Sequence, residues 1–198
     1  CGLDDYRLTI AELAPFKKAG GRTVVDPTCR GIGRNPSKLR EIAAGSSLQI
    51  VMGSGYYLQD SHPPVLKGMS KQDVADEIVR DALEGVDGTD AKIGLIGEIG
   101  VSGDFTPDEE KSLRGAAMAQ ARTKLPIMVH LPAWYRHGGR VLDIVAEEGG
   151  DLNHTILCHM NPSGEDVDYQ VACAKRGAFI EGSEEHTSEL QSRIPISY

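Results

Sequence analysis

Six short apolar runs, rich in β-branched residues, alternate along the chain with longer segments of helical periodicity. Such runs are typical of buried parallel strands, because helices cover the faces of a parallel sheet. The pattern therefore predicts repeated β–α units. The predicted strands span 23–26, 48–53, 93–99, 127–130, 155–159 and 178–181.

Helix starts between these runs are marked by capping residues. Asn35 precedes Pro36, Ser70 precedes Asp73 by three positions, and Thr106 precedes Pro107. A short polar side chain followed by proline or an acidic residue is a common first turn. One predicted helix starts at 35, and others cover 70 to about 85, 106–121, 139–148 and 166–176. A further helix is predicted over 11–18, before the first strand, although Pro15 lies within it.

Several predicted strands end in side chains that are costly to bury, which are Asp26, Glu98, His130, His159 and Glu181. The carboxyl ends of parallel barrel strands meet at one mouth, where active sites are assembled. Two imidazoles and a carboxylate suit zinc or a similar divalent ion. Such an ion lowers the pKa of bound water to about 7, so the arrangement predicts hydrolytic chemistry.

Each of these residues also has a structural interpretation. A histidine at a strand end is more often hydrogen-bonded than metal-bound, so the prediction depends on Glu98, His130 and His159 occurring together. Asp26 is better explained as a turn cap. Cys158 adjoins His159, but strand alternation points them to opposite faces and predicts an inert, buried thiol. Cys29 has no histidine nearby in the sequence, which disfavours a nucleophilic role.

Composition excludes several other classes. The net charge is −8 and the basic residues are scattered, so a nucleic-acid partner is not expected. The chain has no run of eighteen apolar residues, so no membrane partner is expected either. Four cysteines without CxxC spacing favour a reducing, cytoplasmic setting. The sequence does not indicate an oligomeric state.

Residues 1–182 are predicted to form one domain, whereas residues 183–198 break the β–α rhythm. The segment SEEHTSELQS reads as a translated sequencing-library adapter. We therefore expect 183–198 to be a non-native tail and exclude it from functional reasoning. The absence of a start methionine leads us to expect that the chain is a fragment of a longer reading frame.

The segments GGRTVVDPTCRGIGRNP, IVMGSGYY, IGEIGVSGDFTPDEEKSLRGAAMAQA, PIMVHLPAW and ILCHMNPS resemble the phosphotriesterase-related family of the amidohydrolase superfamily. The resemblance implies a (β/α)8 barrel, with the predicted strands as its second to seventh and the first and eighth missing. It also implies a binuclear zinc centre, with manganese or cobalt as alternatives. Glu98 would be the bridging ligand, and His130 and His159 would complete one metal site. Tyr57 and Trp134 would contact a small-molecule substrate.

Two parts of the family pattern are missing, namely the His-x-His pair of the first strand and the aspartate of the eighth. We therefore assign no catalytic residue and expect the isolated chain to be poorly soluble and nearly inactive. The family hydrolyses esters, lactones, amides or phosphoesters, and the glutamate at position 98 favours a carboxylic ester, lactone or amide. The alternatives are a TatD-type metal-dependent deoxyribonuclease and a catalytically dead metal-binding barrel remnant.

Overall fold

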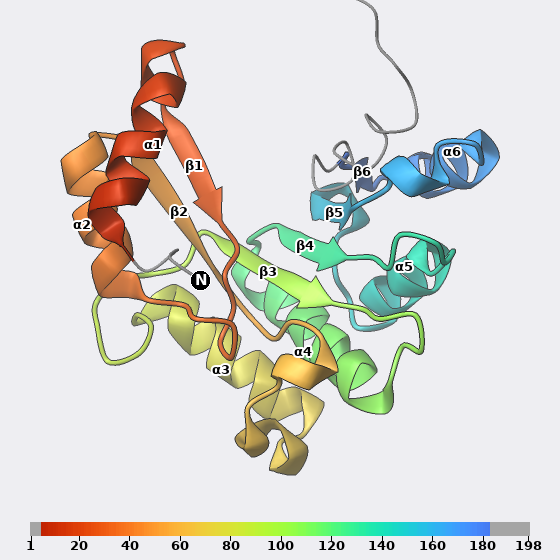
Figure 1. Ribbon diagram of the computed structural model, residues 1–198. Helices are drawn as coiled ribbons and strands as arrows, with labels where there is room; N and C mark the ends of the chain where they lie inside the picture. Colours follow the sequence, from red (N-terminus) through yellow and green to blue (C-terminus); the bar gives the residue numbers. More distant parts are fainter. Residues whose placement is uncertain (1–4, 183–198) are drawn as a thin grey trace, which may run out of the picture.

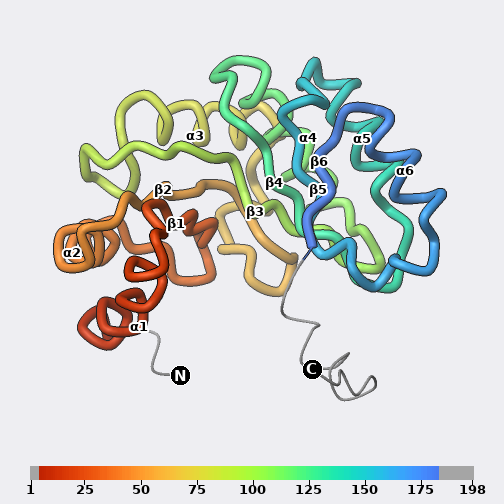
Figure 2. Tube along the Cα trace, turned by 90° about the horizontal axis from the view of Figure 1, so that it is seen from above, coloured from red at the N-terminus to blue at the C-terminus, as the bar shows by residue number. Residues whose placement is uncertain are grey.

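The computed structural model describes residues 5–182, and the predicted tail lies outside the described residues. Its strands form one parallel sheet in chain order. The strands are β1 Thr23–Asp26, β2 Gln49–Ser54, β3 Leu95–Gly100, β4 Ile127–His130, β5 Thr155–Cys158 and β6 Phe179–Ile180. They follow an arc that is open on one side (Figure 2). The predicted partial (β/α) barrel is confirmed.

The helices lie on the outside of this arc (Figure 1). They are α1 Tyr6–Lys18, α2 Pro36–Ser46, α3 Lys71–Leu83, α4 Pro107–Thr123, α5 Gly138–Glu147 and α6 Val167–Lys175. The predicted caps are present: the side chain of Asn35 accepts a hydrogen bond from the amide of Lys38. Ser70 opens α3 and Thr106 opens α4, each with a capping box.

Most element boundaries differ from the predicted ones, usually by one or two residues. Helix α1 begins five residues before position 11, because the side chain of Asp5 accepts from the amides of Arg7 and Leu8 and caps an earlier start. Within residues 5–182, strand β6 has two residues and pairs with β5. Strand β5 stops at Cys158, because His159 takes a left-handed conformation with φ 59° that cannot continue a strand.

The core lies between the sheet and the outer helices. Ile96 and Ile99 of β3 are fully buried, as is Ile127 of β4. Val74 of α3 and Leu113 of α4 are also fully buried and belong to the same cluster. This packing fixes the strands of the sheet relative to one another, and so fixes the positions of the side chains at their ends.

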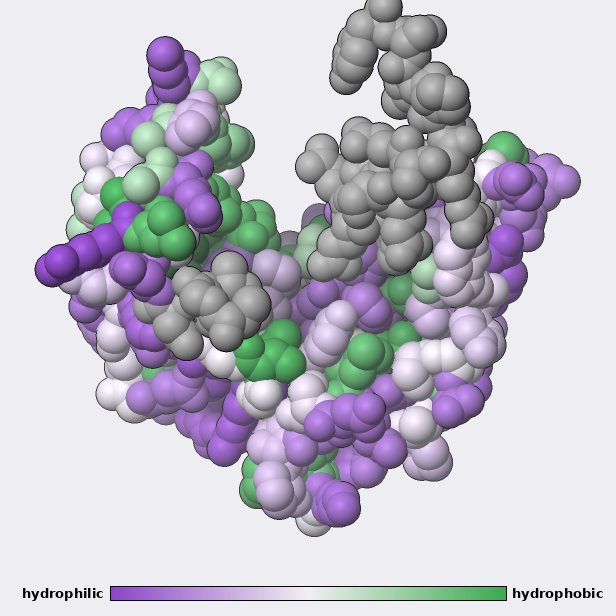
Figure 3. Space-filling model, viewed as in Figure 1, coloured by the Kyte–Doolittle hydropathy of each residue, from purple (hydrophilic) through white to green (hydrophobic). Residues whose placement is uncertain are grey.

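Apolar surface gathers over α1 and β1, beside the hollow of the arc (Figure 3). Val25 of β1 is 47% exposed, which is unusual for a residue of a barrel strand. No helix in the described part of the chain is long and apolar enough to cross a membrane.

Candidate metal centre

Glu98, His130 and His159 converge at the carboxyl ends of β3, β4 and β5. Each offers one ligand atom, and these atoms lie within 4.8 Å of one another. Nε2 of His159 is 3.0 Å from Oε1 of Glu98, and Nδ1 of His130 is 3.4 Å from the same oxygen. The side chains are half-buried, so the cluster is shielded by the protein and still reachable from solvent. The convergence predicted from the strand ends is therefore found.

The loop after β1 fixes the backbone of Glu98. The Glu98 amide donates to the carbonyl oxygen of Pro27 at 2.9 Å. The thiol of Cys29 donates to the carbonyl oxygen of Glu98 at 3.1 Å. The β3–β4 register shifts between Ile96 and Ile99, so Glu98 sits at an irregularity of the ladder. Irregularities of this kind re-aim a side chain, and here the side chain meets the two histidines.

The charge state of Glu98 suits a metal ligand. Burial raises the pKa of its carboxyl group, but hydrogen bonds and charges from His130 and His159 outweigh burial and bring the pKa to about 2. The side chain is therefore an anion at neutral pH. Carboxylate and neutral imidazole are the forms in which these residues bind zinc.

Cys158 is buried at the end of β5, next to His159. Strand β5 ends at Cys158 and His159 takes a left-handed conformation, so the alternation of the two side chains stays a prediction. Burial raises the pKa of the Cys158 thiol, and the charges of Glu98 and Glu181 raise it further. The predicted burial of this thiol is confirmed, and its raised pKa agrees with an unreactive thiol.

Tyr57 and Trp134, the predicted substrate contacts, lie in different surroundings. The Tyr57 hydroxyl is 3.1 Å from Nδ1 and 3.4 Å from Nε2 of His130, and the two rings meet edge to face with centroids 4.8 Å apart. Trp134 lies in the turn after β4 and is 71% exposed. Tyr57 is thus part of the candidate site, and contact of either residue with a substrate stays a prediction.

Asp26 and Cys29 lie outside the group of ligand atoms. Oδ1 of Asp26 accepts a hydrogen bond from the amide of Thr28 at 2.9 Å, which confirms the predicted turn cap. Cys29 is fully buried, and burial raises the pKa of its thiol, which agrees with the absence of a nucleophilic role. No sequence signal indicates the contact between Cys29 and Glu98, because the two residues are 69 positions apart.

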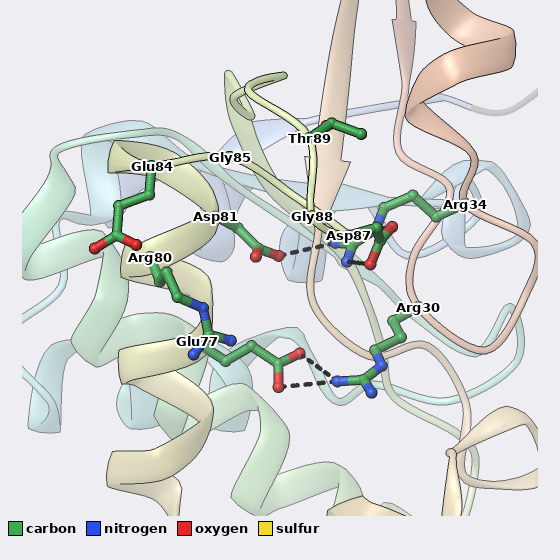
Figure 4. Close-up of a pocket in the computed structure, with 10 residues that line it drawn as sticks. All are labelled: Arg30, Arg34, Glu77, Arg80, Asp81, Glu84, Gly85, Asp87, Gly88 and Thr89. Atoms are coloured by element: carbon green, nitrogen blue, oxygen red, sulfur yellow. Dashed lines mark hydrogen bonds and ion pairs between the residues drawn. The ribbon is translucent and has the colours of Figure 1, made fainter.

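A further cavity of about 460 Å³ lies between α3 and the loop after β1 (Figure 4). The Arg34 side chain is only 3% exposed and donates to Asp81 and Asp87, each at 3.0 Å. Arg30 donates to Glu77. A buried arginine needs such partners, because an unpaired charge is costly to bury. We assign these pairs a structural role.

Comparison with known proteins places the fold and the cluster in context. The model of the phosphotriesterase family matches residues 2–194. An N-acetyltaurine hydrolase of Dictyostelium discoideum is 36% identical over 90% of the chain, and a phosphotriesterase-related protein of Nematostella vectensis is 37% identical over 87%. The chain covers 48% and 49% of these relatives, so it spans about half of their length.

Two solved structures share the fold. The crystal structure of a resiniferatoxin-binding protein from Rhodobacter sphaeroides is 65% identical, with a TM-score of 0.89 over 90% of this chain and 50% of that one. The phosphotriesterase homology protein from Escherichia coli, solved with phosphate in its active site, is 30% identical, with a TM-score of 0.84 over 90% of this chain and 61% of that one.

Proposed function

The chain belongs to the phosphotriesterase family, and from this premise we propose that Glu98, His130 and His159 bind a divalent cation and serve a hydrolase reaction. We propose zinc as the cation, with manganese or cobalt as alternatives. The observation that carries the proposal is the convergence of one carboxylate and two imidazoles within 4.8 Å. This donor set matches the ligands that zinc takes in catalytic sites.

When bound, the cation supplies Lewis-acid activation of water and of the bond to be cleaved. The residues of the chain hold and orient the site. Glu98 contributes a fixed negative charge, because its backbone is bonded on both sides to the loop after β1. The Tyr57 hydroxyl is within reach of both ring nitrogens of His130, so it can orient the ring whichever nitrogen binds the cation.

We propose a small carboxylic acid derivative as the substrate, an amide, ester or lactone. Relatives that carry the name N-acetyltaurine hydrolase support an amide. A glutamate at position 98 supports the same class over a phosphotriester. The exposed Trp134 would offer an apolar surface to the acyl group. The chain spans about half the length of these relatives. We therefore propose this substrate class for the whole protein, of which the chain would form a part.

The setting we propose is cytoplasmic, without a nucleic-acid or membrane partner. Cys29, Cys158 and Cys173 are free thiols, which suits a reducing compartment. The family match favours this hydrolase over the deoxyribonuclease alternative.

Metal analysis of the purified, zinc-loaded chain tests the proposal. We expect about one zinc per chain, from one three-ligand site, and loss of that zinc in the His130→Ala variant. Long incubations at high chain concentration, with N-acetyltaurine, a lactone, an aryl ester and an aryl phosphotriester, test the substrate class. The chain is expected to be nearly inactive, and any residual turnover should favour the carboxylic substrates over the phosphotriester. Absence of zinc, a phosphotriester preference, or salt-sensitive DNA binding would each contradict the proposal.

A further inference from the structure

A buried carboxylate outside the metal cluster joins two loops at the carboxyl end of the sheet. Glu109 lies in the first turn of α4 and is 1% exposed. Its carboxylate accepts from the amides of Gln59, Ser102 and Thr106 at 3.1, 3.1 and 3.0 Å, and from the Ser102 hydroxyl at 2.8 Å. Gln59 belongs to the loop after β2, and Ser102 to the loop after β3.

Helix capping alone does not account for this arrangement. The capping box of α3 has the same local pattern. There, among the residues that the structure describes, Asp73 accepts from the amide and hydroxyl of Ser70, on the exposed surface. At α4 the corresponding carboxylate is buried and bonded to two loops besides its own helix start. A buried carboxylate is costly unless donors surround it, so the donors from Gln59 and Ser102 determine its position.

The two loops joined by Glu109 also determine where Tyr57 lies. Gln59 follows Tyr57 by two positions. Gly100, at the end of β3, packs so closely on the backbone of Tyr57 and Leu58 that a Cβ there would overlap them. The Gly100 amide donates to the carbonyl oxygen of Tyr56 at 3.1 Å. The hydroxyl of Tyr57, whose backbone is held in this way, lies 3.1 Å from Nδ1 of His130.

We propose that Glu109 is a positioning residue of the metal centre: its buried carboxylate ties the loops after β2 and β3 together and so holds the Tyr57 hydroxyl against His130. The inference rests on the proposed function only where it treats His130 as a metal ligand. It adds a series of contacts that leads from Glu109 in α4, through the loops after β2 and β3, to the ring of His130.

The test uses Glu109→Gln with Asp73→Asn as the matched control. Both variants replace the acid of a capping box with its amide, but only the first weakens the bonds to the loops. The first readout is the NMR signal of the His130 ring in the metal-free chain. The second is the dissociation constant for Zn²⁺, measured against a chromophoric chelator. We expect Glu109→Gln to shift the ring signal and to weaken zinc binding about tenfold, within the range found when partners of a metal ligand are lost.

Asp73→Asn should leave both readouts unchanged. A double-mutant cycle with Tyr57→Phe locates the effect, because Glu109→Gln should have little further effect on zinc binding once the hydroxyl is gone. Equal effects of Asp73→Asn and Glu109→Gln, or full additivity with Tyr57→Phe, would overturn the proposal.

If Glu109→Gln fails to fold, Ser102→Ala takes its place, because it removes one hydroxyl donor and leaves the carboxylate and the cap. A smaller shift of the His130 signal in the same direction supports the proposal, and an unchanged signal overturns it. If no form of the chain binds zinc, the proposed function fails, and the ring signal of the metal-free variants still decides whether Glu109 positions Tyr57.

Discussion

Nε2 of His159 lies 3.0 Å from Oε1 of Glu98, although β5, which His159 follows, and β3, which carries Glu98, are separated in the sheet by β4. The contact is possible because His159 leaves the strand direction in a left-handed conformation and Glu98 sits at an irregularity of β3. His130 ends the strand between them, so one carboxylate oxygen serves both imidazoles.

Glu98→Gln tests the importance of that carboxylate. We expect zinc binding to fall by more than the 10–100-fold found for partners of metal ligands, because the variant loses the negative charge. The overall fold should persist, since the amide can still bond to the two rings. Zinc titration, with circular dichroism as the folding control, provides the measurement. Zinc affinity equal to that of the parent chain would exclude Glu98 as a ligand.

Gly100→Ala should damage the site through packing rather than through backbone strain. A Cβ at position 100 would overlap the backbone of Tyr57 and Leu58. We expect a loss of about 1–3 kcal/mol in the free energy of unfolding, together with weaker zinc binding. Gly139→Ala in α5 is the control, because a Cβ there meets nothing within 4 Å. That variant should gain about 0.5–1 kcal/mol, and urea denaturation distinguishes the two.

Much of the fold could be predicted because apolar runs and capping residues are local signals. The bounds of β1 and β4 match the predicted ranges, and Glu98, His130 and His159 follow from the rule that barrel strands end at a common mouth. Their role as metal ligands stays a prediction. The resemblance to the phosphotriesterase family is confirmed by the family match.

The missed features depend on contacts between distant segments. The thiol of Cys29 reaches the backbone of Glu98 across 69 positions, and Glu109 reaches Gln59 across 50. Neither pair has a spacing that the sequence can reveal. The left-handed conformation of His159 ends β5 one residue before the predicted end, and the apolar run does not reveal it.

The pH dependence of stability should reveal the ion pairs that join α3, α4 and α5. Lys71 and Arg114 donate to Glu148 at 2.7 and 2.8 Å. Burial raises the pKa of Glu148, but these two cations outweigh it and hold the pKa below its ordinary value of 4.5. A lowered pKa in the folded state means that the stabilisation is complete above about pH 4.5 and is lost as the pH falls further.

Glu148→Gln should therefore lower the free energy of unfolding by about 1 kcal/mol at pH 7, and the difference from the parent should shrink as the pH falls below 4.5. Urea denaturation over that pH range measures it. Glu41→Gln is the control, because Glu41 is exposed and has no ion pair recorded within residues 5–182. A difference that grows on acidification would contradict the assignment.

Cys29→Ala should loosen Glu98 without touching its carboxylate. The Cys29 thiol is fully buried and donates to the Glu98 carbonyl oxygen, so alanine leaves that acceptor without its bond. We expect a cost of about 1 kcal/mol in stability, faster amide hydrogen exchange across 97–100, and weaker zinc binding.

Cys173→Ala is the matched control, because Cys173 is 2% exposed and lies in α6. It loses the same sulfur and should leave exchange at 97–100 unchanged. Cys29→Ser keeps a donor and should restore slow exchange at Glu98. Equal exchange at 97–100 in Cys29→Ala and Cys173→Ala would show that the thiol only fills space, and that the Pro27 carbonyl alone holds this strand end.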